Sequence, residues 1–161
     1  MIVITGSMGQ LGSDIEKVCQ KRSIPYLGID REDLNITDRD AVNDFFESHS
    51  FETLIHCAAY TAVDLAEDEI ESCISVNTKA VEYISDACKK HNVKLIFIST
   101  DYVFDGLKDG LYETSDMTSA LSIYGQSKAI AEKYIEDTLS KYFIVRISWA
   151  FGINGKNFVR T

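Results

Sequence analysis

The sequence lacks a surplus of positive charge. Its 161 residues include 16 Lys and Arg against 25 Asp and Glu, which gives a formal net charge of −9 and a pI near 4.7. Nucleic acids and anionic membranes bind basic surfaces, so neither is expected as a partner. A phosphate-bearing cofactor is still compatible with this charge, because backbone amides and a few basic residues can bind phosphate locally.

The chain also lacks paired cysteines, internal repeats and low-complexity stretches. Cys19, Cys57, Cys73 and Cys88 lie in predicted helices or strands, and no two of them have C-x-x-C spacing. We expect reduced, buried thiols, as is typical of a cytosolic protein, and therefore a cytoplasmic location. No signal peptide or membrane span is predicted, because the first residues already form a strand.

What is present is an ordinary globular composition with alternating elements. Hydrophobic residues make up 45% of the chain and charged residues 25%, and a chain of this length can bury about 70% of its unfolded surface in one core. We predict strands at 1–5, 24–29, 52–57, 93–98 and 142–147, helices at 10–22, 38–48, 68–90 and 123–140, and a long functional loop at 101–122. This alternation predicts an α/β fold with a doubly wound parallel sheet, a Rossmann-type dinucleotide-binding domain with its ligand at the carboxyl ends of the strands.

A glycine-rich turn joins the first predicted strand to the first predicted helix. The apolar run 1–5 leads directly into Gly6-Ser7-Met8-Gly9-Gln10-Leu11-Gly12. Such a turn presents backbone N–H groups and the positive end of a helix dipole, which favours a pyrophosphate. The spacing is G-x-x-G-x-x-G rather than G-x-G-x-x-G, so a merely tight turn is the alternative. Asp30 ends the second strand 18 residues after Gly12, where a dinucleotide site places an acid on the adenosine ribose.

A tyrosine and a lysine stand four residues apart in Tyr124-Gly125-Gln126-Ser127-Lys128, and Ser99-Thr100-Asp101 lies upstream. On a helix, such a pair shares one face. A nearby ammonium lowers the pKa of a phenol from about 10, which makes the tyrosine a general acid or base near neutrality. A surface Tyr–Lys pair on an ordinary helix is the alternative, and the spacing alone does not decide between them.

These motifs, together with others in collinear order along the whole chain, resemble the N-terminal part of the dTDP-4-dehydrorhamnose reductase family, in the extended short-chain dehydrogenase/reductase superfamily. The matching segments are Ile4-Thr5-Gly6, Gly9-Gln10-Leu11-Gly12, Ala58-Ala59-Tyr60-Thr61-Ala62-Val63-Asp64, Val76-Asn77, Ser99-Thr100-Asp101-Tyr102-Val103-Phe104-Asp105-Gly106, Tyr124-Gly125-Gln126-Ser127-Lys128, Arg146-Ile147-Ser148-Trp149 and Gly155-Lys156-Asn157-Phe158. The run 99–106 separates this branch from most other sugar-nucleotide reductases and epimerases.

The resemblance implies a role for each matching residue. The catalytic residues are Thr100, which hydrogen-bonds the substrate carbonyl, Tyr124, which is the general acid, and Lys128, which holds the nicotinamide ribose. The expected cofactor-binding residues are Gly6, Ser7, Met8, Gly9, Gln10, Leu11, Gly12, Asp30, Arg31, Ala58, Ala59, Tyr60, Asn77, Tyr124 and Lys128, and the expected substrate-binding residues are Val63, Thr100, Asp101, Tyr102 and Trp149. Asn77 is either part of a water-mediated proton relay or a helix residue bonded to its own backbone.

The pair Asp30-Arg31 bears on the choice of cofactor. An acid hydrogen-bonds the 2′-hydroxyl of NAD, whereas an adjacent arginine can receive the 2′-phosphate of NADP. The family uses both, so we predict NADPH with NADH accepted. No metal is predicted: Asp14 matches a position linked in some members to a magnesium site between subunits, but the other ligands would follow Thr161.

Three departures from the family pattern stand out. Ala120-Leu121-Ser122 replaces the usual Pro-Leu-Asn before the catalytic tyrosine, which puts loop rigidity and one polar contact in doubt. Asn35 replaces an acid near the adenine. His56 stands where the family usually has asparagine, and we assign it no catalytic role.

The implied function is NADPH-dependent reduction of the C4 carbonyl of dTDP-4-dehydro-β-L-rhamnose to dTDP-β-L-rhamnose, in dTDP-rhamnose biosynthesis. Another nucleotide-sugar reductase or epimerase of the superfamily is one alternative. A non-catalytic NADP-binding regulatory subunit, resembling the methionine adenosyltransferase β subunit, is another. The expected partner is a nucleotide sugar, and a homodimer of the full-length protein stays open.

The last predicted feature concerns the end of the sequence. Residues 157–161 are typical of a helix cut in its first turns. We therefore expect the domain 1–161 to be truncated before the substrate-binding region, with the cofactor half nearly complete.

Overall fold

The computed structural model describes residues 1–152 and 154, and the helix expected at 157–161 lies outside these residues. All five predicted strands form one parallel sheet in the order β2-β1-β3-β4-β5. The strands are β1 (Ile2–Thr5), β2 (Tyr26–Ile29), β3 (Thr53–His56), β4 (Lys94–Thr100) and β5 (Tyr142–Ile147). The predicted doubly wound fold is confirmed.

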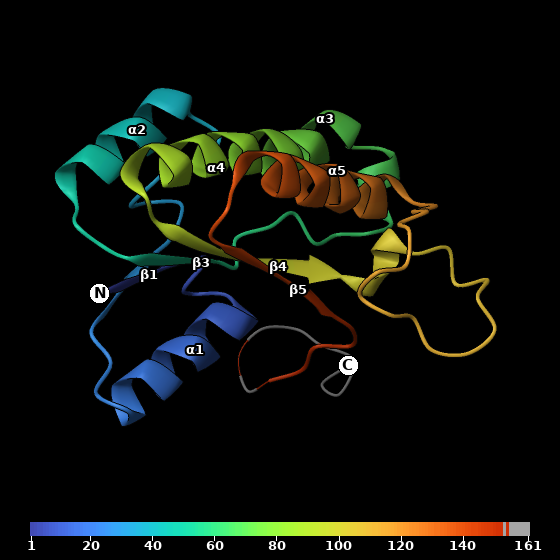
Figure 1. Cartoon of the computed structure of the whole chain (residues 1–161), viewed down its shortest axis with the longest axis horizontal. Helices are drawn as coiled ribbons and strands as arrows, with labels where there is room; N and C mark the ends of the chain where they lie inside the picture. Colours follow the sequence, from blue (N-terminus) through green and yellow to red (C-terminus); the bar gives the residue numbers. More distant parts are fainter. Residues whose placement is uncertain (153, 155–161) are drawn as a thin grey trace.

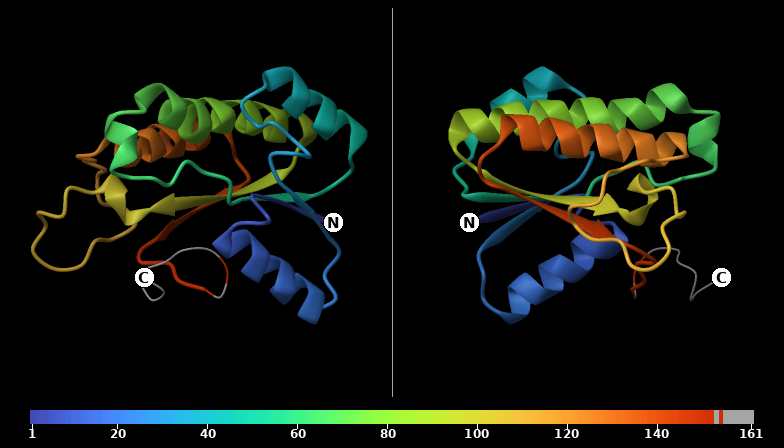
Figure 2. Two further views of the ribbon diagram at one scale, coloured as in Figure 1. Left: turned by 180° about the vertical axis from the view of Figure 1, so that it is seen from behind. Right: turned by 45° about the vertical axis from the view of Figure 1, so that its right-hand side comes forward.

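Helices cover the two faces of this sheet unequally, as Figures 1 and 2 show. Among the described residues, α1 (Gln10–Lys21) is the one helix on the first face, while α2 (Arg39–Ser48), α4 (Ala80–His91) and α5 (Ile123–Thr138) lie together on the other. The sheet grows outward in opposite directions from β1, so right-handed crossovers place α1 and the later helices on opposite sides. Asp38, whose carboxylate accepts from the backbone N–H groups of Asp40 and Ala41, caps α2.

The main core lies under the three later helices. Its buried members include Val3, Leu54, Leu95 and Phe97 from the strands. Phe143 on β5 is 59% exposed, because strand side chains alternate and α1 does not reach this edge of the sheet. Within the described part of the chain, no helix is both long and apolar enough to cross a membrane.

The single helix predicted at 68–90 is wrong in detail. The segment folds as a short 3-10 turn η1 (Leu65–Glu67), a short helix α3 (Ile70–Ile74), a π-helical stretch η2 (Ser75–Lys79) and then α4. Single π turns inside helices are frequent at functional sites. Within this stretch the side chain of Asn77 bonds to Tyr60 and Ser127, which are contacts with other elements that a periodicity argument does not include. The loop predicted at 101–122 begins with a short 3-10 turn, η3 (Asp101–Val103).

All four cysteines are free in the structure. Cys19, Cys73 and Cys88 are buried, and Cys57 is half-buried. The expectation of reduced, largely buried thiols therefore agrees with the fold.

Candidate active site

A large cleft follows the carboxyl ends of the strands, at the point where the order of the sheet reverses between β1 and β3. Its volume is about 1230 Å³, above the roughly 300–1,000 Å³ of typical ligand pockets. An extended ligand such as a dinucleotide has room there. The predicted site residues that line it are Gly6, Met8, Gly9, Gln10, Leu11, Gly12, Asp30, Arg31, Ala58, Ala59, Tyr60, Val63, Thr100, Asp101, Tyr102, Tyr124, Lys128 and Trp149.

The turn between β1 and α1 forms one end of the cleft. Gly6 has a φ of +65°, and a Cβ placed on it would lie 2.8 Å from the backbone nitrogen of Ala58. A Cβ on Gly12 would lie 2.2 Å from the carbonyl oxygen of Gly6. These two glycines are required by the backbone packing of the turn. At Gly9 a Cβ would lie 3.1 Å from the Gly6 oxygen, which is tight but a smaller conflict than at Gly6 or Gly12, and the glycine leaves the turn without a side chain where a phosphate is expected.

Asp30 stands at the end of β2 and faces this turn. Its Oδ2 accepts a hydrogen bond from the backbone N–H of Met8 at 3.1 Å, and its Oδ1 accepts from the backbone N–H of Arg31 at 2.8 Å. The carboxylate therefore lies beside the glycine-rich loop, as the spacing of 18 residues from Gly12 predicted. Arg31 is exposed at the rim of the cleft.

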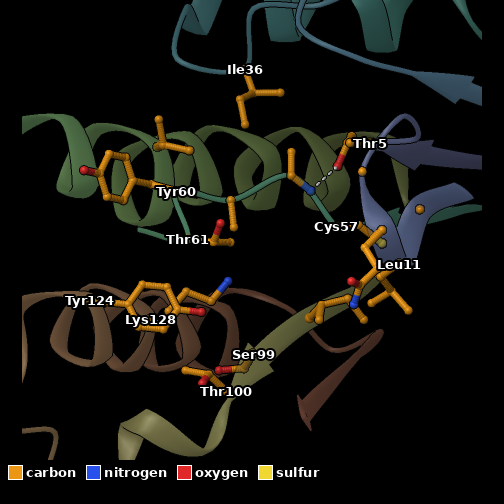
Figure 3. Close-up of a pocket in the computed structure, with 18 of the residues that line it drawn as sticks. Thr5, Leu11, Ile36, Cys57, Tyr60, Thr61, Ser99, Thr100, Tyr124 and Lys128 are labelled. Carbon is orange, nitrogen blue, oxygen red and sulfur yellow. Dashed lines mark hydrogen bonds between the residues drawn. The ribbon is translucent and has the colours of Figure 1, made fainter. Parts of the chain in front are cut away.

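The other end of the cleft is built from the end of β4 and the start of α5 (Figure 3). Thr100 is the last residue of β4, and Tyr124 and Lys128 project from α5. The Ser122 hydroxyl caps this helix by accepting from the N–H of Gly125. A Cβ on Gly125 would lie 2.2 Å from the carbonyl oxygen of Tyr102, so glycine is what lets α5 approach the Thr100 turn this closely.

Burial, rather than the neighbouring lysine, controls the pKa of Tyr124. Desolvation raises that pKa above its ordinary value, and a hydrogen bond with Thr100 opposes the increase. The expectation that Lys128 lowers it is wrong for this structure. Burial also lowers the pKa of Lys128 to about 7, despite the opposing charge of Glu132. The Nζ atom of Lys128 lies 4.0 Å from the centre of the Phe97 ring, so much of its surroundings is apolar.

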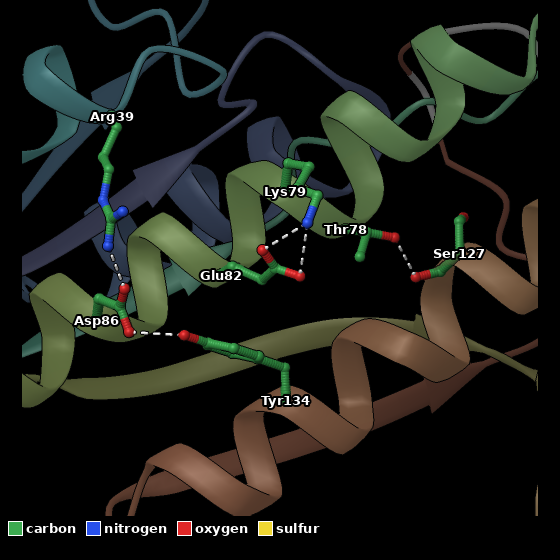
Figure 4. A network of polar contacts seen from close by, with 7 residues as sticks. All are labelled: Arg39, Thr78, Lys79, Glu82, Asp86, Ser127 and Tyr134. Carbon is green, nitrogen blue, oxygen red and sulfur yellow. Dashed lines mark hydrogen bonds and ion pairs between the residues drawn. The ribbon is translucent and has the colours of Figure 1, made fainter.

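Asn77 does not line the cleft. It is 1% exposed, and its side-chain amide brackets Tyr60: Oδ1 accepts from the Tyr60 N–H at 2.8 Å, and Nδ2 donates to the Tyr60 carbonyl at 3.0 Å. Nδ2 also lies 3.1 Å from Oγ of Ser127, the residue before Lys128. The amide therefore ties the segment after β3 to α5 rather than bonding to the backbone of its own helix, and the water-mediated relay stays a prediction. Figure 4 shows the neighbouring contact, in which Thr78 donates to the Ser127 carbonyl.

Ser7 is the other predicted site residue that does not line the cleft. It is 8% exposed, and its backbone N–H donates to the carbonyl of Ile29. Ser7 therefore joins the turn to the end of β2 rather than facing the cleft.

The residues predicted to bind substrate lie at the end of the cleft that holds Thr100, Tyr124 and Lys128. Asp101 accepts from the hydroxyls of Thr100 (3.2 Å) and Ser148 (2.5 Å), which links the ends of β4 and β5. The rings of Tyr102 and Tyr124 meet edge to face, with centroids 5.8 Å apart. Trp149 is 74% exposed, and its φ of +52° is uncommon for a non-glycine residue.

Several lining residues were not predicted from sequence. They are Thr5, Ile29, Leu34, Asn35, Ile36, Thr37, Cys57, Thr61, Glu69, Ser72, Ser75, Val76, Ile98, Ser99, Ile147 and Ala150. Those at strand ends could have been found from the rule that ligands bind there. Glu69 and Ser72 could not, because they reach the cleft through the irregular segment before α4. Glu69 accepts a hydrogen bond from the Tyr60 hydroxyl at 2.9 Å. Desolvation of the phenol, together with the Glu69 carboxylate, raises the pKa of Tyr60 to about 12.

His56 has a structural environment. It is 1% exposed, its Nδ1 lies 2.7 Å from the Thr5 hydroxyl, and burial lowers its pKa to about 3. It is therefore neutral near pH 7. Asp14 pairs with Lys17 at 2.8 Å on the surface of α1. Across residues 1–152 and 154, no group of three or more His, Cys, Asp or Glu side chains is arranged to hold a metal.

Comparisons with protein-family models and with known proteins indicate the same family. The model of the RmlD substrate binding domain matches residues 1–161. A dTDP-4-dehydrorhamnose reductase of Aggregatibacter actinomycetemcomitans is 41% identical over 161 residues, which is 99% of this chain and 55% of the relative. A dTDP-4-dehydrorhamnose reductase of Mycolicibacterium smegmatis is 36% identical over 99% of this chain and 49% of its own. The chain thus spans about half the length of the curated relatives it matches.

Solved structures agree. The crystal structure of a dTDP-4-dehydrorhamnose reductase from Bacillus anthracis, in complex with NADP, superposes with a TM-score of 0.94 at 35% identity, covering 98% of this chain and 56% of that one. A dTDP-4-dehydrorhamnose reductase from Clostridium acetobutylicum gives the same TM-score at 36% identity, with the same coverage. The resemblance inferred from the sequence motifs is confirmed.

Proposed function

The chain belongs to the RmlD substrate binding domain family, and on that premise we propose that it is the dinucleotide-binding part of an NADPH-dependent dTDP-4-dehydrorhamnose reductase. One observation carries the proposal. A glycine-rich turn suited to a pyrophosphate and the set Thr100, Tyr124 and Lys128 line opposite ends of one cleft. An enzyme of this kind needs both in a single site.

NADPH fits the cofactor end of the cleft. The turn carries no side chain at Gly9, Asp30 stands where the adenosine ribose is expected, and exposed Arg31 at the rim of the cleft would bind a 2′-phosphate. The NADP complex of the Bacillus anthracis relative supports this choice. Because Asp30 can also bind a free 2′-hydroxyl, NADH is accepted in the proposal.

When bound, the nicotinamide would supply a hydride to the C4 carbonyl carbon of dTDP-4-dehydro-β-L-rhamnose. Tyr124 then gives its phenolic proton to the carbonyl oxygen as negative charge develops there, and dTDP-β-L-rhamnose results. The raised pKa of Tyr124 keeps this proton in place until it is needed, which suits a general acid. Thr100 donates a hydrogen bond to the same oxygen.

Lys128 serves the cofactor in this scheme. Its amine lies in the cleft and its pKa of about 7 allows either protonation state near neutrality. Ribose hydroxyls accept hydrogen bonds from an ammonium, so their presence favours the protonated form. The same charge then stabilises the phenolate that Tyr124 becomes after proton transfer.

The remaining parts of the proposal concern the whole protein. The domain 1–161 would be followed by a region that completes the nucleotide-sugar pocket, and a homodimer of the full-length protein is compatible with it. The four free cysteines support the proposed cytoplasmic location.

The test has two stages. NADPH titrated into the chain should bind, as measured by calorimetry, and the full-length protein should oxidise NADPH only when dTDP-4-dehydrorhamnose is present. Binding without oxidation would favour the regulatory-subunit alternative. Absence of NADPH binding in a folded chain would reject the proposal.

A further inference from the structure

A largely buried ion pair joins α5, the helix that carries Tyr124 and Lys128, to β5. Glu132 lies one turn after Lys128 on α5, and Arg146 reaches it from β5. Arg146 Nη2 lies 2.7 Å from Glu132 Oε2, and Nε lies 3.0 Å and 3.2 Å from the two carboxylate oxygens. The side chains are 20% and 3% exposed. Among the ion pairs of residues 1–152 and 154, this one is the most buried.

Stability alone is a weak reason for such a pair. Desolvating two charges is expensive, and apolar replacements of a buried ion pair are often neutral or even stabilising. The pair is therefore expected to do more than stabilise the fold. Two observations point to the active site.

First, the guanidinium of Arg146 also contacts the segment 104–122. Its Cζ lies 5.0 Å from the centre of the Phe104 ring, and Nη1 donates to the Thr114 carbonyl at 3.4 Å. Phe104 in turn stacks on Tyr112, with centroids 4.1 Å apart. This segment follows the turn that carries Thr100 and Tyr102, and it ends at the cap of α5. Arg146 therefore connects α5, which carries Tyr124 and Lys128, with the segment 104–122 that follows the Thr100 turn.

Second, Glu132 is at the i+4 position from Lys128, where side chains on a helix are neighbours. Its charge raises the pKa of Lys128, against the larger effect of burial. The other titratable groups that face Lys128 are Cys57, next to β3, Cys73 on α3, and His56 on β3. Glu132 is the one carboxylate among these groups, and of the charges that raise the pKa of Lys128 its effect is the largest.

We propose that Arg146 is a positioning residue that acts through Glu132: it engages the carboxylate that would otherwise pair with Lys128, and it holds the segment 104–122 against the catalytic helix. The idea rests on the proposed function only in the role given to Lys128. Arg146 touches neither reacting group, so its effect on the reaction is indirect.

The proposal predicts opposite effects of the two partners on Lys128. In Arg146→Met, Glu132 is released toward Lys128, so the pKa of the lysine should rise by about half a unit or more. In Glu132→Gln the attraction is lost, so that pKa should fall by a similar amount. NMR titration of isotope-labelled lysine side chains measures it directly without any ligand, with the Lys128 signal assigned by its loss in Lys128→Met.

A matched control lies on the same helix. Lys133 and Asp137 form an exposed i,i+4 pair, 70% and 61% exposed, on α5. Lys133→Met should leave the Lys128 titration unchanged. Hydrogen exchange of the amides in 104–122 should become faster in Arg146→Met but not in Lys133→Met.

If the single variants do not fold, the double variant Glu132→Gln/Arg146→Met leaves neither partner of the ion pair as an unpaired charge, and the pKa of Lys128 should still fall in it. A Lys128 titration that is unchanged, or shifted in the same direction by both single variants, would overturn the proposal and leave the pair a purely structural one. Because Lys128 is observed without ligand, this outcome is separate from a failure of NADPH binding, which would count against the proposed function instead.

Discussion

The end of the cleft formed by residues 6–12 is made of backbone, whereas the end formed by Thr100, Tyr124 and Lys128 is made of side chains. At the first end, Gly6 and Gly12 are set by contacts that no Cβ would allow. At the second end, Lys128 is 2% exposed, and its amine lies over the Phe97 ring instead of in water. The first end depends on shape, and the second depends on how burial changes proton affinity.

Each end of the cleft should therefore respond differently to substitution. Substitutions at the backbone end should change affinity for the dinucleotide and leave pH dependence alone. Substitutions at the side-chain end should change turnover or the pH dependence of stability; loss of the Tyr124 phenol should leave affinity nearly unchanged, whereas loss of Lys128, which serves the cofactor, should also weaken binding. Four experiments test that division.

The largest effect is expected for Tyr124→Phe in the full-length protein. General acid catalysis contributes about 10²–10⁴-fold, so turnover should fall by at least about 100-fold. NADPH affinity should be nearly unchanged, because the phenol acts on the substrate oxygen. Steady-state kinetics and calorimetry measure both quantities. Substantial activity in this variant would disprove the general-acid role and remove the functional distinction between the ends.

Lys128→Met should next change the pH dependence of stability. Unfolded Lys128 keeps its proton up to its ordinary pKa of 10.5, whereas the folded structure releases it near pH 7. Between these values the unfolded state binds more protons, so the free energy of unfolding of the unmodified chain rises with pH. From pH 7 to 9 the rise from this residue is on the order of 2 kcal/mol.

Denaturant unfolding at several pH values measures this contribution as the difference between the two proteins. Above pH 9 the raised pKa values of Cys57 and Cys88, about 12 each, act in the opposite sense, so the comparison stays below it. Equal slopes in both proteins would show that Lys128 is not desolvated as the structure indicates.

At the backbone end, Gly9→Val should weaken NADPH binding by at least tenfold, or about 1.4 kcal/mol. A Cβ at Gly9 would lie 3.1 Å from the Gly6 oxygen, a tight contact that a small shift of the turn relieves, so the variant should fold with its side chain at the phosphate position. Gly12→Ala is the contrasting variant: its Cβ would lie 2.2 Å from a carbonyl oxygen, so it should lower the melting temperature as well. Unchanged affinity in folded Gly9→Val would place the phosphate elsewhere.

The smallest effect is expected for Arg31→Ala. If Arg31 binds the 2′-phosphate, the unmodified chain should prefer NADPH over NADH, and the variant should lose most of that preference, roughly tenfold or less. The exposure of Arg31 keeps the contribution modest. Equal affinities for the two dinucleotides before mutation would exclude this role for the arginine.

Much of the site could be predicted because its motifs follow strands directly. The turn at 6–12, Asp30 and Thr100 lie where a parallel sheet collects its ligands, and the i,i+4 spacing put Tyr124 and Lys128 on one helix face. Asn77 shows the limit of this reasoning. Its partners, Tyr60 and Ser127, are 17 and 50 residues away, and no local pattern indicates which of them an amide will choose.

The sequence by itself determined the alternation of strands and helices and the glycine-rich turn, because these depend on local periodicity and on backbone sterics, and its family resemblance indicated Thr100, Tyr124 and Lys128 as the candidate catalytic set. Only the tertiary structure decided their proton affinities and their supports. The pKa of Lys128 falls because helices and strands distant in sequence exclude water from it. The pairing of Glu132 with Arg146 likewise exists only because α5 packs beside β5.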